Sequence, residues 1–222
     1  MNGEPVVAPG TDRRLGQLPP DNAELHVSLA DVLQKQGRVA EAIEHWRRAV
    51  AIHPDSAGLH DALGLALAIQ NNLEEAAEHF RRALAIDSDY FQAHNNLALV
   101  LKLQGRLDEA VEHLRTALRL KPDYPPVEIN LADILAKLGQ VDEAIRLAEH
   151  ATKSTDRKDA AALDTLAAAY AAAGRWDEAV NTAREAVELA RETGAAETAQ
   201  EFAERLQRYE EAQRTNREGA AR

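Results

Sequence analysis

The chain has 222 residues and no cysteine, so disulfides, thiolate metal sites and a cysteine nucleophile are excluded. Its formal net charge of −11 argues against a nucleic-acid partner, because such partners require a basic surface. Hydrophobic residues make up 45% of the chain and aromatic residues only 4%, which favours helices packed through alanine and aliphatic side chains over a large sheet.

Residues 1–22 are rich in proline and glycine and show little periodicity. They contain no apolar stretch of the ~7–15 residues that a secretory signal needs. No segment of the chain approaches the ~18 apolar residues of a membrane helix, and the alanine-rich stretch 160–173 contains Asp164. We therefore expect a disordered N-terminal arm, no direct membrane insertion and a cytoplasmic location.

Five copies of one pattern follow the arm. They begin at Ala23, Ala57, Phe91, Pro125 and Ala160, so the first four starts are 34 residues apart and the last step is 35. We assign the extra residue to the polar stretch 152–159, and we count positions within each copy from its start. Leucine occupies position 7 in every copy. Position 8 is small (Ala30, Gly64, Ala98, Ala132, Ala167), position 15 is glycine or asparagine (Gly37, Asn71, Gly105, Gly139, Gly174), and alanine fills position 20 (Ala42, Ala76, Ala110, Ala144, Ala179) and position 27 (Ala49, Ala83, Ala117, Ala151, Ala186).

This pattern predicts two helices in every copy. Positions 3, 7, 10, 11 and 14 share one stripe of a first helix, and the apolar residues at 17, 21, 24, 28 and 30 are the inner positions of a second. Glycine or asparagine at position 15 tolerates the left-handed backbone that ends the first helix. The small residues at positions 8, 20 and 27 let the two helices approach closely, and a larger side chain there would cost about 1–3 kcal/mol. Ala148 and Ala183 replace the bulky residue at position 24, so the fourth and fifth pairs are expected to pack more tightly or less stably.

The copies resemble the tetratricopeptide repeat family, whose unit is a helix–turn–helix of ~34 residues. The copy at residues 91–124 is the best single match. Its sequence is similar to those of the long arrays in O-linked N-acetylglucosamine transferases and in many bacterial family members. The resemblance implies an all-α fold, a right-handed α-solenoid of about five repeats plus a C-terminal capping helix. A coiled coil would lack the regular glycine breaks, and a compact bundle would lack the 34-residue register.

Beyond Gly194, the residues Ala199, Phe202, Leu206 and Tyr209 recur at helical spacing on one face. A terminal repeat exposes a hydrophobic edge, and a helix with one polar face can cover it. We therefore expect the following division of the chain: a disordered arm at 1–22, five repeats at 23–56, 57–90, 91–124, 125–159 and 160–194, a capping helix at 195–214, and a disordered tail at 215–222.

Six of the eight histidines follow the repeat, which favours a structural role. Equivalent residues in successive repeats should lie on the order of 10 Å apart, whereas zinc ligands lie within about 2.1 Å of the ion. The six histidines are His26, His60 and His94 at position 4 and His45, His79 and His113 at position 23.

The nine acids at positions 18 and 19 account for most of the net charge and favour helix N-termini, so they need not recruit a basic partner. We predict no metal site, no cofactor and no catalytic residue, because nucleophile elbow, P-loop and GxGxxG motifs are all missing from the sequence.

The first helices also carry a face opposite the core stripe, at positions 2, 5, 6, 9, 12 and 13. In the family that the chain resembles, these positions line a concave groove that takes an extended peptide or a partner helix. Asn96 and Asn130 share position 6 and resemble part of an asparagine ladder, because an amide can donate to and accept from a peptide backbone. Ser28, Ala62 and Thr165 occupy the other three rungs, so the ladder is incomplete. The predicted peptide-binding residues are Ser28, Asp31, Lys35, Asp61, Leu65, Asn95, Asn96, Leu99, Lys102, Asn130, Asp133, Lys137, Asp164 and Thr165.

Chaperone adaptors of the family grip a C-terminal carboxylate with lysine at position 5 and asparagine at position 9 of the first repeat. This chain has Val27 and Asp31 there, so we do not expect that activity. The mixture of aspartate and lysine on the predicted face favours a mildly basic or mixed-charge peptide instead.

Three hypotheses on function remain open at this point. The leading one is a non-catalytic scaffold that binds a protein or peptide in the groove. The second is the substrate-recruiting array of a larger or partnered, glycosyltransferase-like enzyme whose catalytic part is absent from this chain; the coding sequence upstream of Met1 would test it. The third is self-assembly, although a capping helix should cover one edge and favours a monomer.

Overall fold

The computed structural model describes residues 22–220, and within them the chain forms α-helices and no strand. The predicted all-α helical repeat array is therefore confirmed. Except for Asn22, the predicted arm lies outside the described residues. None of the described helices combines the length and the apolarity that a bilayer crossing needs. The helices are α2 (Ala23–Lys35), α3 (Val39–Ile52), α4 (Ala57–Ile69), α5 (Leu73–Ile86), α6 (Phe91–Leu103), α7 (Leu107–Leu120), α8 (Pro125–Lys137), α9 (Val141–Ser154), α10 (Ala160–Ala172), α11 (Trp176–Glu192) and α12 (Ala196–Ala220).

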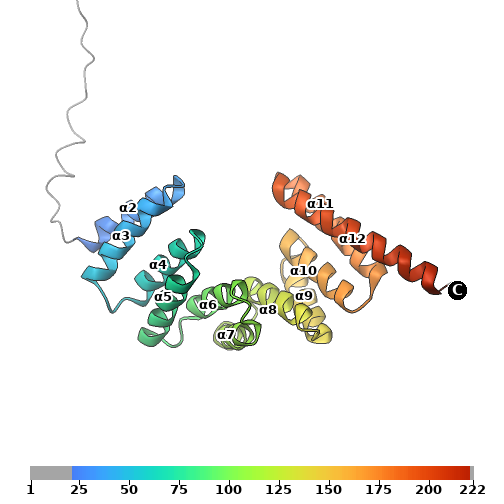
Figure 1. The fold of residues 1–222 in the computed structure, drawn as a ribbon, viewed down its shortest axis with the longest axis horizontal. Helices are drawn as coiled ribbons and strands as arrows, with labels where there is room; N and C mark the ends of the chain where they lie inside the picture. The colour runs from blue at the N-terminus through green and yellow to red at the C-terminus, as the bar shows by residue number, and fades with distance from the viewer. Residues whose placement is uncertain (1–21, 221–222) are drawn as a thin grey trace, which may run out of the picture. The chain divides into compact units, whose positions relative to one another are not determined.

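The chain divides into two compact units, Met1–Ile86 and Asp87–Arg222. Unit 1 holds the helix pairs α2–α3 and α4–α5, and unit 2 holds α6–α7, α8–α9 and α10–α11 followed by α12 (Figure 1). The first helix of each pair begins at the residue from which the sequence pattern was counted. Each copy of the pattern therefore corresponds to one helix pair.

The turn within each pair has the same backbone in every repeat. Position 15 has a positive φ throughout, from 72° at Gly174 to 76° at Gly105, and Asn71 reaches 63° in the second repeat. The next residue donates its N–H back to the carbonyl of position 11, as Arg38 does to Leu33 at 2.9 Å. The left-handed residue thus satisfies a carbonyl at the helix end that would otherwise lack a partner.

The small residues at positions 8, 20 and 27 lie where the two helices of a repeat meet, and all of them are buried. Gly64 gives the clearest case. A Cβ atom added to Gly64 would lie 2.7 Å from Cε1 of the Phe80 side chain, which is fully buried in α5. The second repeat therefore accommodates its large ring at position 24 by omitting a side chain at position 8.

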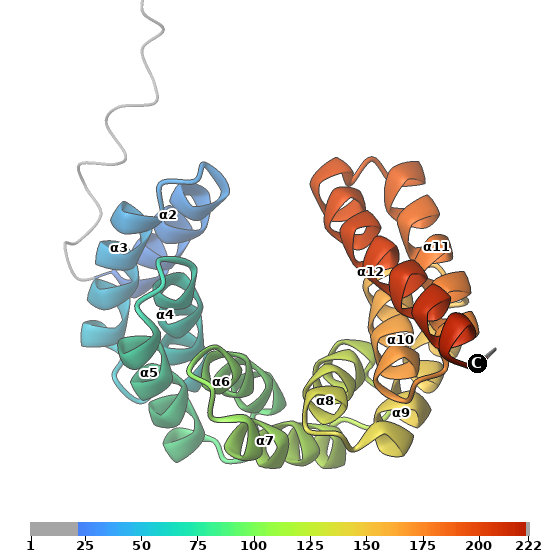
Figure 2. The same cartoon turned by 45° about the vertical axis from the view of Figure 1, so that its right-hand side comes forward.

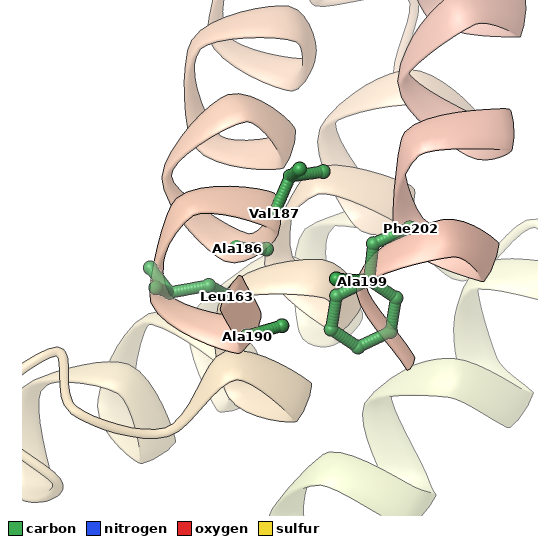
Figure 3. Close-up of a cluster of buried hydrophobic side chains, with 6 residues drawn as sticks. All are labelled: Leu163, Ala186, Val187, Ala190, Ala199 and Phe202. Carbon is green, nitrogen blue, oxygen red and sulfur yellow. The ribbon is translucent and has the colours of Figure 1, made fainter. Parts of the chain in front are cut away.

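The terminal helix α12 repeats the register of a first helix. Phe202, Ala203 and Leu206 stand at the places of the leucine, the small residue and the second leucine of the pattern, counted from Ala196. Ala199 and Phe202 pack against Leu163 of α10 and Ala186, Val187 and Ala190 of α11, as Figure 3 shows. The end of the array is thus closed by half a repeat.

Helix α12 also runs farther than the sequence suggested. It continues to Ala220, so the described part of the segment 215–222 is helical where a disordered tail was expected. No glycine stands at position 15 to stop it, and Gln213 and Arg217 bond to Asp177 at the start of α11, at 2.5 and 2.6 Å. These contacts hold the extension beside α11 (Figure 2).

We expect Gly64→Ala to lower the free energy of unfolding by about 1–3 kcal/mol, because the new methyl group would overlap the Phe80 ring. Gly58→Ala is the matched control in the same helix. A Cβ at Gly58 meets nothing within 4 Å, so that variant should be neutral or more stable by up to about 1 kcal/mol. Urea denaturation followed by circular dichroism measures both, and equal effects of the two substitutions would contradict the packing account.

Candidate binding surface

We call the exposed side of the first helices the first-helix face and describe it separately in each unit. In unit 1, α2 presents Ser28, Asp31 and Lys35, all of which are exposed. The Ser28 hydroxyl donates to the backbone carbonyl of Glu24 at 2.8 Å, so it is already engaged within its own helix. Asp31 and Lys35 leave this part of the face polar.

The neighbouring helix α4 differs in character. Leu65 is exposed, and so is Ile69 one turn farther on, which makes this part of the face apolar. Asp61, by contrast, is buried and engaged with another group of the chain. Asp61 was also predicted to face a ligand, and it is only 6% exposed.

In unit 2, two side-chain contacts join α6 to α8 across the first-helix face. The amide of Asn130 donates to Oδ1 of Asn95 at 2.9 Å, and the Asn95 amide in turn donates to Asn96 at 3.4 Å. Nζ of Lys102 lies 2.6 Å from Oδ2 of Asp133. The predicted residues of α6 and α8 are therefore brought together, and the asparagines bond to each other.

Asp133 lies between two lysines. The same Oδ2 atom accepts a hydrogen bond from Lys137 at 2.8 Å. Burial acts to raise the pKa of Asp133, but the hydrogen bonds and charges of Lys102 and Lys137 outweigh it and hold the pKa below its ordinary value. This cluster of one acid and two bases leaves the middle of the face with one net positive charge.

At the start of α10 the face is closed by α12. Arg205 reaches from α12 to Asp164, with 2.8 Å between Nη2 and Oδ2, and both Asp164 and Thr165 are buried. The guanidinium also lies over the Phe202 ring, with 5.0 Å from Cζ to the ring centroid. Asp164 and Thr165 were predicted to be open to a peptide. That prediction differs from the structure because α12 occupies the place of a sixth first helix.

Two exposed apolar residues of the face were missed by the sequence analysis. Leu103 is 65% exposed and Ile69 is 60% exposed, and both stand at position 13. In α6, Leu103 follows the half-buried Leu99 by one helical turn. The sequence analysis had assigned position 13 to this face, so the repeat position of Ile69 and Leu103 could have identified them. Unit 2 thus combines amide groups, a charge cluster and an apolar edge on α6.

The repeating histidines pair within repeats. In each of the first three repeats the Nδ1 atoms of positions 4 and 23 lie 2.9 Å apart, as in His60 and His79. Nε2 of His60 lies 3.0 Å from the carbonyl oxygen of Pro54 and must donate to it, so Nδ1 of the neutral ring accepts from His79. Burial is the main cause that lowers the pKa of His79. The structural role predicted for these residues is thus that of a hydrogen bond between the two helices.

An open surface pocket of about 500 Å³ lies in unit 2 between α9, the turn that follows it and α10. It adjoins a core cluster in which Leu166 and Tyr170 pack near Ala148, the small residue at position 24 of the fourth repeat. The hydroxyl of Tyr170 donates to Glu149 at 2.8 Å at the edge of the pocket. Ala148 itself is fully buried, with Leu166 packed against it.

Comparison with known families gives one consistent result. A family model described as tetratricopeptide repeat matches residues 13–57, 27–91 and 62–125, which together span slightly more than half of the chain. Two further models with the same description match residues 101–164 and 160–193. Among curated proteins, no sequence matches the chain.

Solved structures share the fold. PilW, described as a type IV pilus biogenesis factor, has a TM-score of 0.70 at 24% identity, with 83% of this chain and 84% of PilW covered. TTC0263, described as a thermophilic TPR protein in Thermus thermophilus, has a TM-score of 0.68 at 22% identity, with 82% and 98% covered. YrrB, described as a TPR protein with an unusual peptide-binding site, has a TM-score of 0.61 at 19% identity, with 82% and 93% covered. At these identities the likeness concerns the fold.

The Asp164–Arg205 contact generates a prediction on pH. Burial raises the pKa of Asp164 to about 6, although the Arg205 charge acts in the opposite direction. An acid whose pKa is raised on folding contributes stability that is present below its unfolded pKa, ~3.9, and lost as the pH rises through the folded pKa. Relative to Asp164→Asn, the wild-type free energy of unfolding should therefore fall between about pH 4 and pH 7, by on the order of 2 kcal/mol.

Urea denaturation of both proteins across that pH range measures the difference. A difference that grows with pH would mean that the attraction of Arg205 outweighs the burial of Asp164, and it would contradict this account.

Proposed function

Because the chain belongs to the tetratricopeptide repeat family, we propose that it is a non-catalytic scaffold that binds an extended segment of a protein on its first-helix face. The helix pairs provide a rigid support, and the exposed sides of α6 and α8 provide the contacts. YrrB, which has the same fold, is described as having a peptide-binding site, and that description supports the proposal.

One observation carries the proposal, the pair of asparagines that joins α6 to α8. The bond from Asn130 to Asn95 uses one N–H group of Asn130 and one lone pair of Asn95. Each amide side chain has two N–H groups and an oxygen with two lone pairs, so both retain groups that can bond to a peptide backbone. Such contacts recognise an extended chain with little regard to its side chains.

Apolar contacts complete the proposed site. Leu99 and Leu103 lie one turn apart on α6, beside the asparagines in sequence, and Leu103 is 65% exposed. Burying a leucine side chain stabilises a complex by up to about 1.5–3 kcal/mol. We therefore expect the bound segment to place an apolar side chain against α6.

The charges of the face argue for a revised ligand. Asp133 is paired with Lys102 and Lys137, and Asp164 with Arg205, so neither acid is free to attract a basic peptide. We therefore favour a neutral or weakly acidic segment over the mildly basic or mixed-charge one suggested by the sequence. The proposal also places the protein in the cytoplasm as a monomer that binds no nucleic acid and no cofactor and does not insert into a membrane.

The test compares two triple variants in affinity capture from lysate of the source cell, read by mass spectrometry. The first-helix variant combines Asn96→Ala, Asn130→Ala and Lys137→Ala. The control combines Glu112→Ala, Arg146→Ala and Lys153→Ala, three exposed residues of the second helices α7 and α9. Each variant carries three alanines and lowers the net charge by one, so general surface effects cancel.

We expect proteins captured by wild type to be retained by the control and lost from the first-helix variant by at least about tenfold, roughly 1.4 kcal/mol or more. Circular dichroism checks that both variants remain helical. Partners lost only from the control would place binding on the second helices, and partners retained by both variants would remove the first-helix face of unit 2 as the site.

A further inference from the structure

The fourth repeat departs from the histidine pairs of the first three. Position 4 holds Glu128 on α8 in place of histidine, and position 23 holds Leu147. The partner of Glu128 is instead His150, which stands one helical turn farther along α9. Nδ1 of His150 lies 2.7 Å from Oε1 of Glu128. The polar link between the two helices is kept, with a carboxylate in place of one imidazole.

A third group joins this pair. Asp123 lies in the turn between α7 and α8, and its Oδ1 atom is 3.7 Å from Nε2 of His150. One ligand atom from each of Asp123, Glu128 and His150 can be chosen so that all three lie within 4.8 Å of one another. Asp123 has a φ of 54° and stands close to both Pro122 and Pro125, so the turn that presents it has little backbone freedom.

Glu128 is the unusual member of the group. It is 5% exposed, and its second oxygen, Oε2, is buried without a hydrogen-bond partner. A buried carboxylate oxygen without a partner is costly, by about 1–3 kcal/mol or more. His150 and Asp123, by contrast, are 47% and 80% exposed at their side chains. The arrangement is an anchored, under-coordinated carboxylate with two further donors that are open to solvent.

We propose that Asp123, Glu128 and His150 form a binding site for a divalent transition-metal ion of the Zn²⁺ type. Two carboxylates and one imidazole are a ligand set that zinc accepts, and water can complete the coordination because two of the three residues are exposed. An ion bound there would supply a positive charge beside the buried Glu128 carboxylate.

The distances allow this with small movements. Ligand atoms around a tetrahedral ion at about 2.0–2.1 Å are roughly 3.3 Å apart. Atoms up to 4.8 Å apart must therefore approach by about 1.5 Å. Nδ1 of His150 and Oε1 of Glu128, now 2.7 Å apart, must separate slightly if both bind the ion. The exposed side chains of Asp123 and His150 can make that change through their rotamers, while Glu128 stays fixed by its burial.

The third repeat provides an internal comparison. Asp89, at position 33 of the second repeat, precedes α6 as Asp123 precedes α8, and His94 and His113 stand at positions 4 and 23 of the third repeat. The third repeat therefore also has an acid in the preceding turn and a polar pair between its helices. In the part of the chain that the structure describes, however, only the fourth repeat gathers three such side chains closely enough to hold an ion. The third repeat therefore supplies matched control variants.

The experiment is isothermal titration calorimetry of the tag-free, full-length chain with ZnCl₂ in a non-coordinating buffer near pH 7. The test variants are His150→Ala and Asp123→Asn. The controls are His113→Ala, in the third repeat, and Asp89→Asn, in the turn that precedes it. A parallel titration with Co²⁺ reports the ligand set through its visible absorption.

We expect one Zn²⁺ per wild-type chain, affinity lower by at least about tenfold in both test variants, and unchanged affinity in both controls. Asp123 is exposed in a turn, so Asp123→Asn remains informative even if circular dichroism shows that His150→Ala is misfolded. The proposal is overturned if wild type binds no Zn²⁺, if Asp123→Asn binds as well as wild type, or if affinity is lost in His113→Ala instead.

Discussion

The close approach of two helices through small residues is the interaction on which the rest of the structure depends. Positions 8, 20 and 27 are alanine or glycine in every repeat, and each of these residues is buried where its helix meets the partner helix. The pairing of Gly64 with Phe80 shows how far this goes, since not even a methyl group fits without movement of the ring. Each repeat is thereby a preformed unit in which the buried side of the second helix holds the first helix in place.

The packing of the two helices in each repeat determines which of their surfaces remain available to bind a partner. The inner positions of both helices are buried by packing, so only their exposed sides can carry variable side chains, and the proposed site uses those of the first helices. In unit 2 that side is polar in the middle, where Asn95 bonds Asn130 and Lys102 bonds Asp133, and apolar at Leu103. Helix α12 limits the face at α10, because its Arg205 covers Asp164 and its Phe202 fills the terminal core. The array therefore ends in a closed edge on one side of the candidate surface.

The sequence predicted the features that recur in every 34-residue repeat. It did not predict which side chains would contact each other in three dimensions. The helix starts, the left-handed residue at position 15 and the buried small residues all follow from local rules that repeat every 34 residues. The 19-residue pairing of His60 with His79 was present in the sequence three times, but recognising it required knowing that positions 4 and 23 face each other. The length of α12 and the burial of Asp164 depend on tertiary contacts, which no local pattern encodes. The group of Asp123, Glu128 and His150 forms where Glu128 replaces the histidine at position 4, and the repeat pattern does not predict it.

The central claim is that the first helices of unit 2 contact the partner while the second helices only support them. Hydrogen–deuterium exchange of the full chain, with and without a captured partner, tests this most directly because it reports protection helix by helix. The account predicts slower exchange in α6 and α8, Phe91–Leu103 and Pro125–Lys137, with α7 and α9 unchanged. Protection that appears in α7 and α9 but not in α6 and α8 would contradict it.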